Sequence, residues 1–118
     1  MEMQPDGTST LLRIFIGESD KSSHSPLYEA LLFEAKKAGM AGATVLRGIM
    51  SYGASTRVHT AKLIDISQDL PIIVEIVDRE EKIQDFVATV HRLMDEAGCG
   101  GLVTLEKIRV LYYQGRKE

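Results

Sequence analysis

The stretch PIIVEIVDREEKIQDFVATVHRLMDEAG, residues 71–98, decides the fold of this chain. Its opening residues 71–77 predict a strand, and proline is tolerated at the first position of a strand. Asp78 followed by Glu81 resembles a capping box, which marks a helix start. The helix that follows ends at Gly98 and carries the cleanest apolar stripe in the chain: Ile83, Phe86, Val87, Val90, Met94 and Ala97.

A strand and a helix are also predicted near the N-terminus. Residues 11–16 alternate between two faces, which is typical of a strand. Ser25 and Pro26 mark a helix start, with a hydroxyl N-cap and proline at the first helical position. Gly39 is the predicted end of this helix. Its apolar stripe consists of Leu27, Ala30, Leu31, Ala35 and Ala38.

Two further strands complete the pattern. Residues 43–52 predict one, with Gly48 as a weak point or bulge. Residues 102–113 predict the last, and a slip in its alternation near Glu106 and Lys107 indicates a bulge. The order is β-α-β-β-α-β. The predicted fold is therefore α+β, a ferredoxin-like sandwich with two helices on one face of a four-stranded antiparallel sheet.

The chain is predicted to be one domain with one long loop. Its 118 residues are the size of a single ordinary domain. Residues 1–10 are polar and predict a flexible tail, so the domain covers residues 11–118. Residues 53–70 form a connection whose length is uncommon inside a compact domain and usually functional or disordered. Because it carries Arg57 and His59 among small polar residues, we expect it to move without ligand and to meet an anion or a partner.

Composition excludes several classes of protein. With 44% hydrophobic and 26% charged residues, the chain is neither disordered nor membrane-embedded. We see no secretory signal and no apolar run of the roughly 20 residues that span a bilayer. A single cysteine, Cys99, rules out an internal disulfide and fits a reducing compartment, so we expect a cytoplasmic protein. The net charge of −3 gives no general attraction to nucleic acid.

The apolar residues of the strands predict self-association. One face should meet the helices: Leu12, Ile14, Ile16, Ile72, Val74 and Ile76. The opposite face then carries Leu11, Phe15, Ile73 and Val77, with Val45 and Ile49 if the second strand follows the same phase. Arg13 and Glu75 are its polar exceptions and could pair with each other. A face this apolar is normally covered, and another copy of the chain is the economical cover, with fold-back of residues 53–70 as the alternative.

No arrangement of side chains in the sequence indicates catalysis or metal binding. His24, His59 and His91 lie at no metal-ligand spacing, and Cys99 is far from all three. No nucleophile, base and acid form a recognisable set. We therefore predict no catalytic residue, no metal site and no obligatory cofactor, and we expect His91 on the solvated side of its helix.

Glycines near the end of the second helix are the main candidate for a binding site. Gly98, Gly100 and Gly101 would let backbone N–H groups approach a phosphate closely. The alternative is structural, with Gly98 as a helix stop and Gly100-Gly101 as a tight turn.

Three stretches of the chain resemble the P-II signal-transduction superfamily, and most closely its P-II-like branch. They are GATVLRGIMSYG at residues 42–53, PIIVEIVDREEKIQDFV at 71–87, and the GCGGLVT…IRV ending at 98–110. The resemblance implies a homotrimer that binds ADP, ATP or AMP between subunits. It further implies that the long loop signals to a target protein or transporter.

The resemblance also assigns binding residues. Thr44 matches a threonine near the adenine ring and Gly53 the base of the mobile loop. Gly98, Gly100 and Gly101 match the phosphate-binding loop, and Arg109 matches the first arginine of a C-terminal run. Gly101 replaces a phosphate-binding lysine and Leu111 replaces a second arginine, so positive charge must come from elsewhere. Candidates for it are Arg57, Arg109 and Arg47.

Three classes of function remain open at this point. The leading one is a regulatory protein that binds an adenine nucleotide. The alternatives are a trimeric protein-interaction or metal-binding module without nucleotide, and a small-molecule enzyme, since fold does not settle function.

Overall fold

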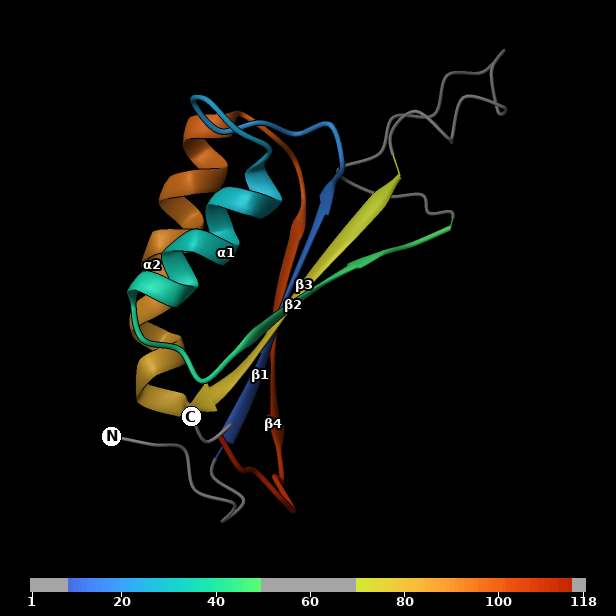
Figure 1. The fold of residues 1–118 in the computed structure, drawn as a ribbon. Coiled ribbons are helices and arrows are strands. Elements are labelled where there is room, and N and C mark those ends of the chain that lie inside the picture. Colours follow the sequence, from blue (N-terminus) through green and yellow to red (C-terminus); the bar gives the residue numbers. More distant parts are fainter. Residues whose placement is uncertain (1–8, 50–69, 116–118) are drawn as a thin grey trace.

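A computed structural model of the chain describes residues 9–49 and 70–115. The elements follow the predicted order: β1 (Ser9–Gly17), α1 (Leu27–Lys37), β2 (Ala43–Arg47), β3 (Pro71–Arg79), α2 (Glu80–Ala97) and β4 (Leu102–Ile108). Both helices lie side by side on one face of the sheet (Figure 1). The α+β ferredoxin-like prediction is confirmed. Within the described ranges, no helix is long and apolar enough to cross a membrane.

The four strands form one antiparallel sheet in the order β2-β3-β1-β4. The two strands with the strongest apolar alternation, β1 and β3, therefore occupy the centre, where both neighbours can satisfy their backbone groups. They pair over their full nine residues, with Leu12 opposite Ile76. β2 and β4 form the two edges of the described sheet.

The core lies between the sheet and the helices, and it contains the residues that alternation assigned to this face. Leu12, Ile14, Ile16, Val74 and Ile76 are completely buried. The helices contribute the rest of the buried apolar cluster, namely Leu27, Leu31, Ala35, Ile83, Phe86, Val90 and Leu93. The predicted stripes therefore point inward with two differences: Ala38 follows the end of α1 and is exposed, and the buried Leu93 is absent from the stripe predicted for α2.

The other face of the sheet carries apolar side chains and a polar row across all four strands, with Glu106 beside this row on β4. Thr44, Glu75, Arg13 and Thr104 are direct partners across the four strands. The Arg13 Nε donates to Glu75 Oε2 at 2.9 Å, which confirms the predicted pair. Arg13 Nη1 also lies 3.4 Å from Oε1 of Glu106. The hydrogen bond with Glu75 and the two nearby carboxylates raise the pKa of the Arg13 guanidinium. We refer to this side as the open face.

The phase predicted for the second strand is wrong. Val45 is paired with Val74, so it lies on the helix-covered face rather than the open face. Leu46 instead shares the open face with Ile73, its partner on β3. Ile49 lies beyond the end of β2 and is 88% exposed. The alternation within β2 alone could not fix which of its faces meets the helices.

Asp78 has a different role from the predicted capping box. α2 begins at Glu80 after Arg79, and no side-chain hydrogen bond caps it. The Asp78 carboxylate is buried and accepts the backbone N–H of Ala41 at 2.8 Å. Lys82 Nζ lies 3.5 Å from the same carboxylate and also donates to the carbonyl of Gly39. These contacts tie the α1–β2 connection to the first turn of α2.

The first helix begins slightly later than predicted. α1 starts at Leu27, with Pro26 rather than Ser25 at the N-cap position and no side-chain cap. The carbonyl of Pro26 accepts the N–H of Ala30 at 3.1 Å, while the Ser25 hydroxyl lies 3.3 Å from that of Ser22. Gly39 follows the helix with a φ of 78°, as a predicted glycine stop should.

Three predicted element ends also need correction. β1 starts at Ser9, so the tail was drawn two residues too long. β2 ends at Arg47, and Gly48 closes the strand by donating its N–H to the Pro71 carbonyl at 2.7 Å. β4 pairs residue for residue with β1 and ends at Ile108, so it contains no bulge. The predicted loop 53–70 lies outside the described residues, apart from Leu70.

Candidate functional site

The predicted phosphate loop follows α2 directly. Gly98 has a φ of 67° and donates its N–H to the carbonyl of Met94 at 3.0 Å. Its left-handed conformation ends the helix, which confirms the predicted stop at Gly98. Residues 99–101 form no turn, so the tight turn predicted for Gly100-Gly101 is wrong. Gly100 has no positive φ, so its backbone conformation is open to other residues.

Gly101 is needed for packing. A Cβ atom at this position would lie 2.6 Å from the backbone oxygen of Phe15 and 2.7 Å from Cε of Met94. The α2–β4 connection therefore passes too close to β1 and α2 for any side chain. Gly101 has a structural role that is independent of any phosphate.

The residue between these glycines, Cys99, is a half-buried free thiol. Burial raises the pKa of its sulfur, and the negative charge of Asp20 raises it further. Asp20 also accepts the N–H of Gly17 at 2.8 Å, so the β1–α1 and α2–β4 connections meet here. Because the pKa is raised, the thiol stays protonated at neutral pH.

Thr44 lies far from the glycine loop within one copy of the chain. It is exposed on β2, opposite Glu75 in the polar row. β3 and β1 separate β2 from β4, and neighbouring strands are about 4.8 Å apart, so the two edges are roughly 14 Å apart. One subunit does not bring Thr44 and Gly101 together.

Arg109 lies at the opposite end of β4 from the glycines. It follows Ile108, which pairs with Ser9, whereas Gly101 precedes Leu102, which pairs with Phe15. At about 3.4 Å per residue, Arg109 and Gly101 are roughly 27 Å apart along the strand. Arg109 is exposed and has no ion-pair partner among the described residues.

Of the other two arginines predicted to supply positive charge, one forms an ion pair and the other is not described. The Arg47 guanidinium is engaged by the carboxylate of Glu18. Gly53 and Arg57 lie outside the described residues. The predicted binding residues that are described thus occupy both edges and both ends of the sheet.

The two described histidines lie on the surface. His24 and His91 are both exposed, as predicted for His91, and His59 is not among the described residues. In the described part of the chain, no three histidine, cysteine or acidic side chains are grouped as metal ligands would be.

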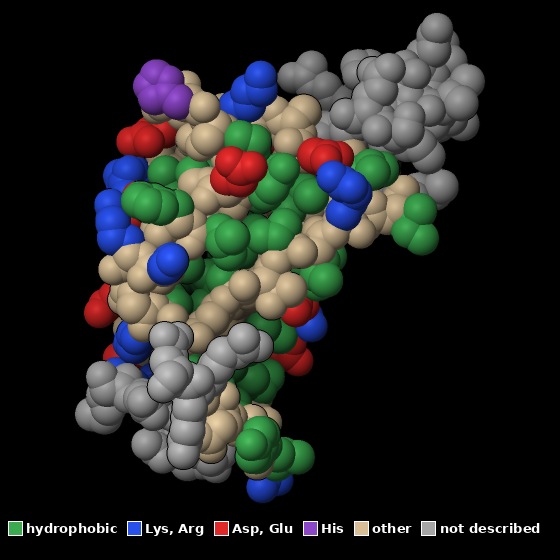
Figure 2. Space-filling model, in the orientation of Figure 1, with side chains coloured by type: hydrophobic (Ala, Val, Ile, Leu, Met, Phe, Trp, Pro, Cys, Tyr) green, Lys and Arg blue, Asp and Glu red, His purple; other side chains and the backbone are tan. Residues whose placement is uncertain are grey.

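Sequence reasoning missed a hollow between α1 and β2. Figure 2 shows hydrophobic side chains gathered between these two elements. The hollow has a volume of about 520 Å³ and is lined by Glu29, Leu32, Phe33, Ala35, Lys36, Met40, Ala41, Gly42 and Ala43. The signal for it is the run of small residues 41–43, which leaves space opposite the larger side chains of α1.

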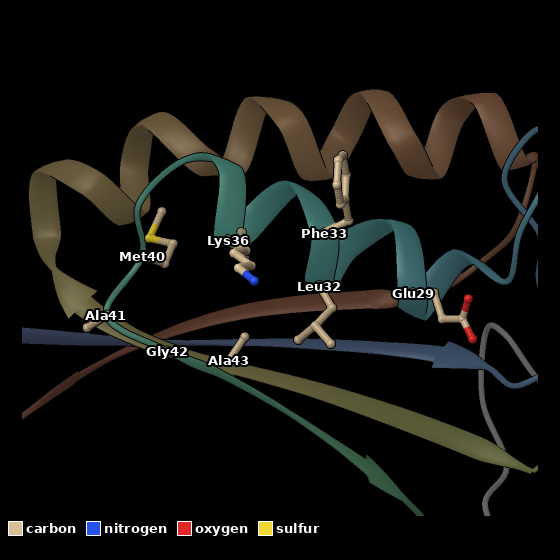
Figure 3. A pocket seen from close by; sticks show the side chains of 9 residues that line it. Glu29, Leu32, Phe33, Lys36, Met40, Ala41, Gly42 and Ala43 are labelled. Carbon is tan, nitrogen blue, oxygen red and sulfur yellow. The ribbon is translucent and has the colours of Figure 1, made fainter. Parts of the chain in front are cut away.

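The side chains around the hollow differ in direction. Leu32 and Lys36 reach from α1 toward β2, whereas Phe33 points away from the sheet (Figure 3). Lys36 has no ion-pair partner within the described ranges, in contrast to the neighbouring Lys37. The Lys37 ammonium lies 3.4 Å from a carboxylate oxygen of Glu34 and 5.4 Å from the ring centroid of Phe33.

A comparison with known proteins identifies the family. The fold defines an α+β protein of ferredoxin-like topology. The profile of the DUF190 family, described as "Uncharacterized ACR, COG1993", matches residues 9–110. This chain therefore belongs to the DUF190 family.

Relatives of the chain carry the family name UPF0166. A UPF0166 protein of Aquifex aeolicus is 40% identical over 102 residues, which cover 86% of this chain and 92% of that protein. A UPF0166 protein of Methanocaldococcus jannaschii is 32% identical over 88 residues, covering 75% and 81%.

Solved structures with a similar fold include a phage enzyme. It is a phage SAM lyase in complex with S-methyl-5'-thioadenosine, with a TM-score of 0.50 and 15% sequence identity. The likeness covers 97% of this chain and 99% of the lyase chain. At this identity the likeness concerns the fold alone.

Proposed function

We propose that this protein is a P-II-like cytoplasmic regulator rather than an enzyme. Copies of the chain assemble, three being the expected number, and an adenine nucleotide binds between them. The 53–70 loop then signals occupancy to a partner protein or transporter. The observation that supports this proposal is that the predicted binding residues Thr44 and Arg109 lie on opposite edges of the sheet, so one copy alone cannot bring them into one site.

The open face supports self-association. Both helices cover the other face, which leaves Phe15 and Ile73 only half-buried at the centre of the open one. Leu46 and Leu102 extend this apolar area to both edges and are 43% and 55% exposed. A second copy laid against this face would remove it from water, which is the usual driving force of association.

The strand order supports a site between copies. A head-to-tail contact joins two different surfaces of neighbouring copies. Such contacts form a closed ring when the rotation from one copy to the next divides a full turn evenly. If the β2 edge of one copy meets the β4 end of the next, Thr44 and Arg109 approach each other. The exposed Arg109 would then supply the positive charge that a phosphate requires in place of the missing lysine.

Calorimetry with ATP, ADP, AMP and cyclic AMP tests the nucleotide. We expect at least one to bind, and Gly100→Val and Arg109→Gln to weaken it while melting temperature stays unchanged. Thr44→Val should reduce discrimination for adenine more than affinity for phosphate. Gly101 is unsuitable for this test because its substitution disturbs packing.

Two controls separate the alternatives. A thermal-shift screen of the nucleotides and S-methyl-5'-thioadenosine distinguishes a nucleotide-binding regulator from a protein that binds the ligand of the lyase. A ligand at a hundredfold excess over its dissociation constant stabilises the folded protein by about 2.7 kcal/mol. Light scattering measures the mass of the assembly. If none of the four nucleotides binds at millimolar concentration, an interaction module without nucleotide replaces the proposal.

A further inference from the structure

We propose that the hollow between α1 and β2 binds a small amphipathic monocarboxylate, a molecule with an apolar body and one carboxylate group. This site is separate from the proposed nucleotide site. Ala43 pairs with Ile76 and lies on the helix-covered face, whereas the side chain of Thr44 lies on the open face. The two proposals therefore succeed or fail independently.

The walls of the hollow suit an apolar body. Leu32 and Met40 supply larger apolar side chains, and Ala35 and Ala43 leave the space between them. A Cβ atom added at Gly42 would meet no other atom within 4 Å, so the wall on this side is open. The volume of about 520 Å³ is within the range of small-molecule sites.

One wall is held in place before any ligand arrives. The segment from Gly39 to Ala41 is bound to the start of α2 through Asp78 and Lys82. Since the Asp78 carboxylate is only 1% exposed, its bond to the Ala41 N–H is shielded from water. A pre-formed wall lowers the entropy that binding would otherwise lose.

The charges at the hollow select the head group. The Lys36 side chain lines the hollow and has no ion-pair partner in the described part of the chain. Its ammonium group can therefore form an ion pair with the carboxylate of a ligand. Glu29 lines the hollow seven residues earlier on the same helix, about 10 Å along its axis. A second carboxylate on the ligand would meet either Glu29 or the apolar walls. One carboxylate is therefore favoured over two.

Calorimetry with octanoate tests the site, with suberate and octylammonium as matched probes. We expect octanoate to bind, and suberate and octylammonium to bind at least tenfold more weakly. Lys36→Met should weaken octanoate about fivefold, the size expected for a partly exposed ion pair. Lys37→Met is the control and should leave affinity unchanged, because Lys37 does not line the hollow.

Filling the hollow tests its location. Ala43→Phe should abolish octanoate binding, and Gly42→Leu is the second variant if the first does not fold. Equal binding of octanoate and octylammonium, equal effects of the two lysine variants, or no octanoate binding at millimolar concentration would each overturn the proposal. If Ala43→Phe instead changes the mass of the assembly, a second copy fills the hollow and the proposal is wrong.

Discussion

Replacing Gly101 by alanine should destabilise the fold without touching a ligand. The new methyl group would lie 2.6 Å from the backbone oxygen of Phe15, well inside ordinary contact distance. Met94 can move its terminal methyl away, but the Phe15 oxygen belongs to a central strand paired on both sides. The strain must therefore move the α2–β4 connection.

The expected loss follows from this geometry. Overpacking by one methyl group in a tight site costs about 1–3 kcal/mol. For a domain of this size each kcal/mol lowers the melting temperature by roughly 4 °C. We therefore expect Gly101→Ala to melt roughly 4–12 °C below the unchanged protein.

The assay is thermal unfolding followed by circular dichroism, with urea unfolding as a second measure. Gly100→Ala is the matched control, because its backbone needs no left-handed conformation. Equal melting temperatures for Gly101→Ala and the unchanged protein would refute the close approach of this connection to β1. An equal loss for both variants would show that the effect is not specific to Gly101.

Three further predictions concern stability, assembly and reactivity. Asp78→Ala should lower the free energy of unfolding by about 3 kcal/mol in urea titration, because the buried carboxylate binds backbone N–H groups; a loss no larger than that of the exposed Asp85→Ala would contradict its anchoring role. Phe15→Asp should reduce the mass measured by light scattering, whereas Phe33→Asp on the outer side of α1 should not, and an unchanged mass for both would exclude the open face as the interface. Cys99 should react with iodoacetamide at higher pH in the folded than in the unfolded protein, because burial raises its pKa. Because the pKa of Cys99 is higher in the folded protein, its contribution to stability is complete below the unfolded pKa and is lost as pH rises through the folded pKa. A folded protein that reacts at the same pH as the unfolded protein, or at a lower pH, would contradict this prediction.

Much of the fold follows from periodicity in the sequence. The alternation of β1 and β3 fixed their buried faces because each strand pairs on both sides and packs under both helices. The stripe of α2 was equally readable. The buried face of β2 could not be predicted, because its five residues at a sheet edge alternate only weakly. The connection to α1 decides which face of β2 meets the helices.

Other features depend on contacts that are distant in the sequence. Asp78 looked like a helix cap, but its partner Ala41 is 37 residues away and competes for the same carboxylate. The hollow was missed because alanine in a stripe predicts core, and only the facing residues reveal the space it leaves. The glycines were found, yet their spacing could not distinguish a phosphate loop from the close packing at Gly101.

If two copies meet at the open face, as proposed, the polar row across it limits how they can do so. Arg13 and its two glutamates cannot be covered by apolar side chains without losing hydration, so a contacting copy must bring polar groups to the same line. In the proposed assembly, the row would favour orientations in which the second copy presents polar groups to Arg13 and its glutamates, and it would disfavour uniformly apolar surfaces.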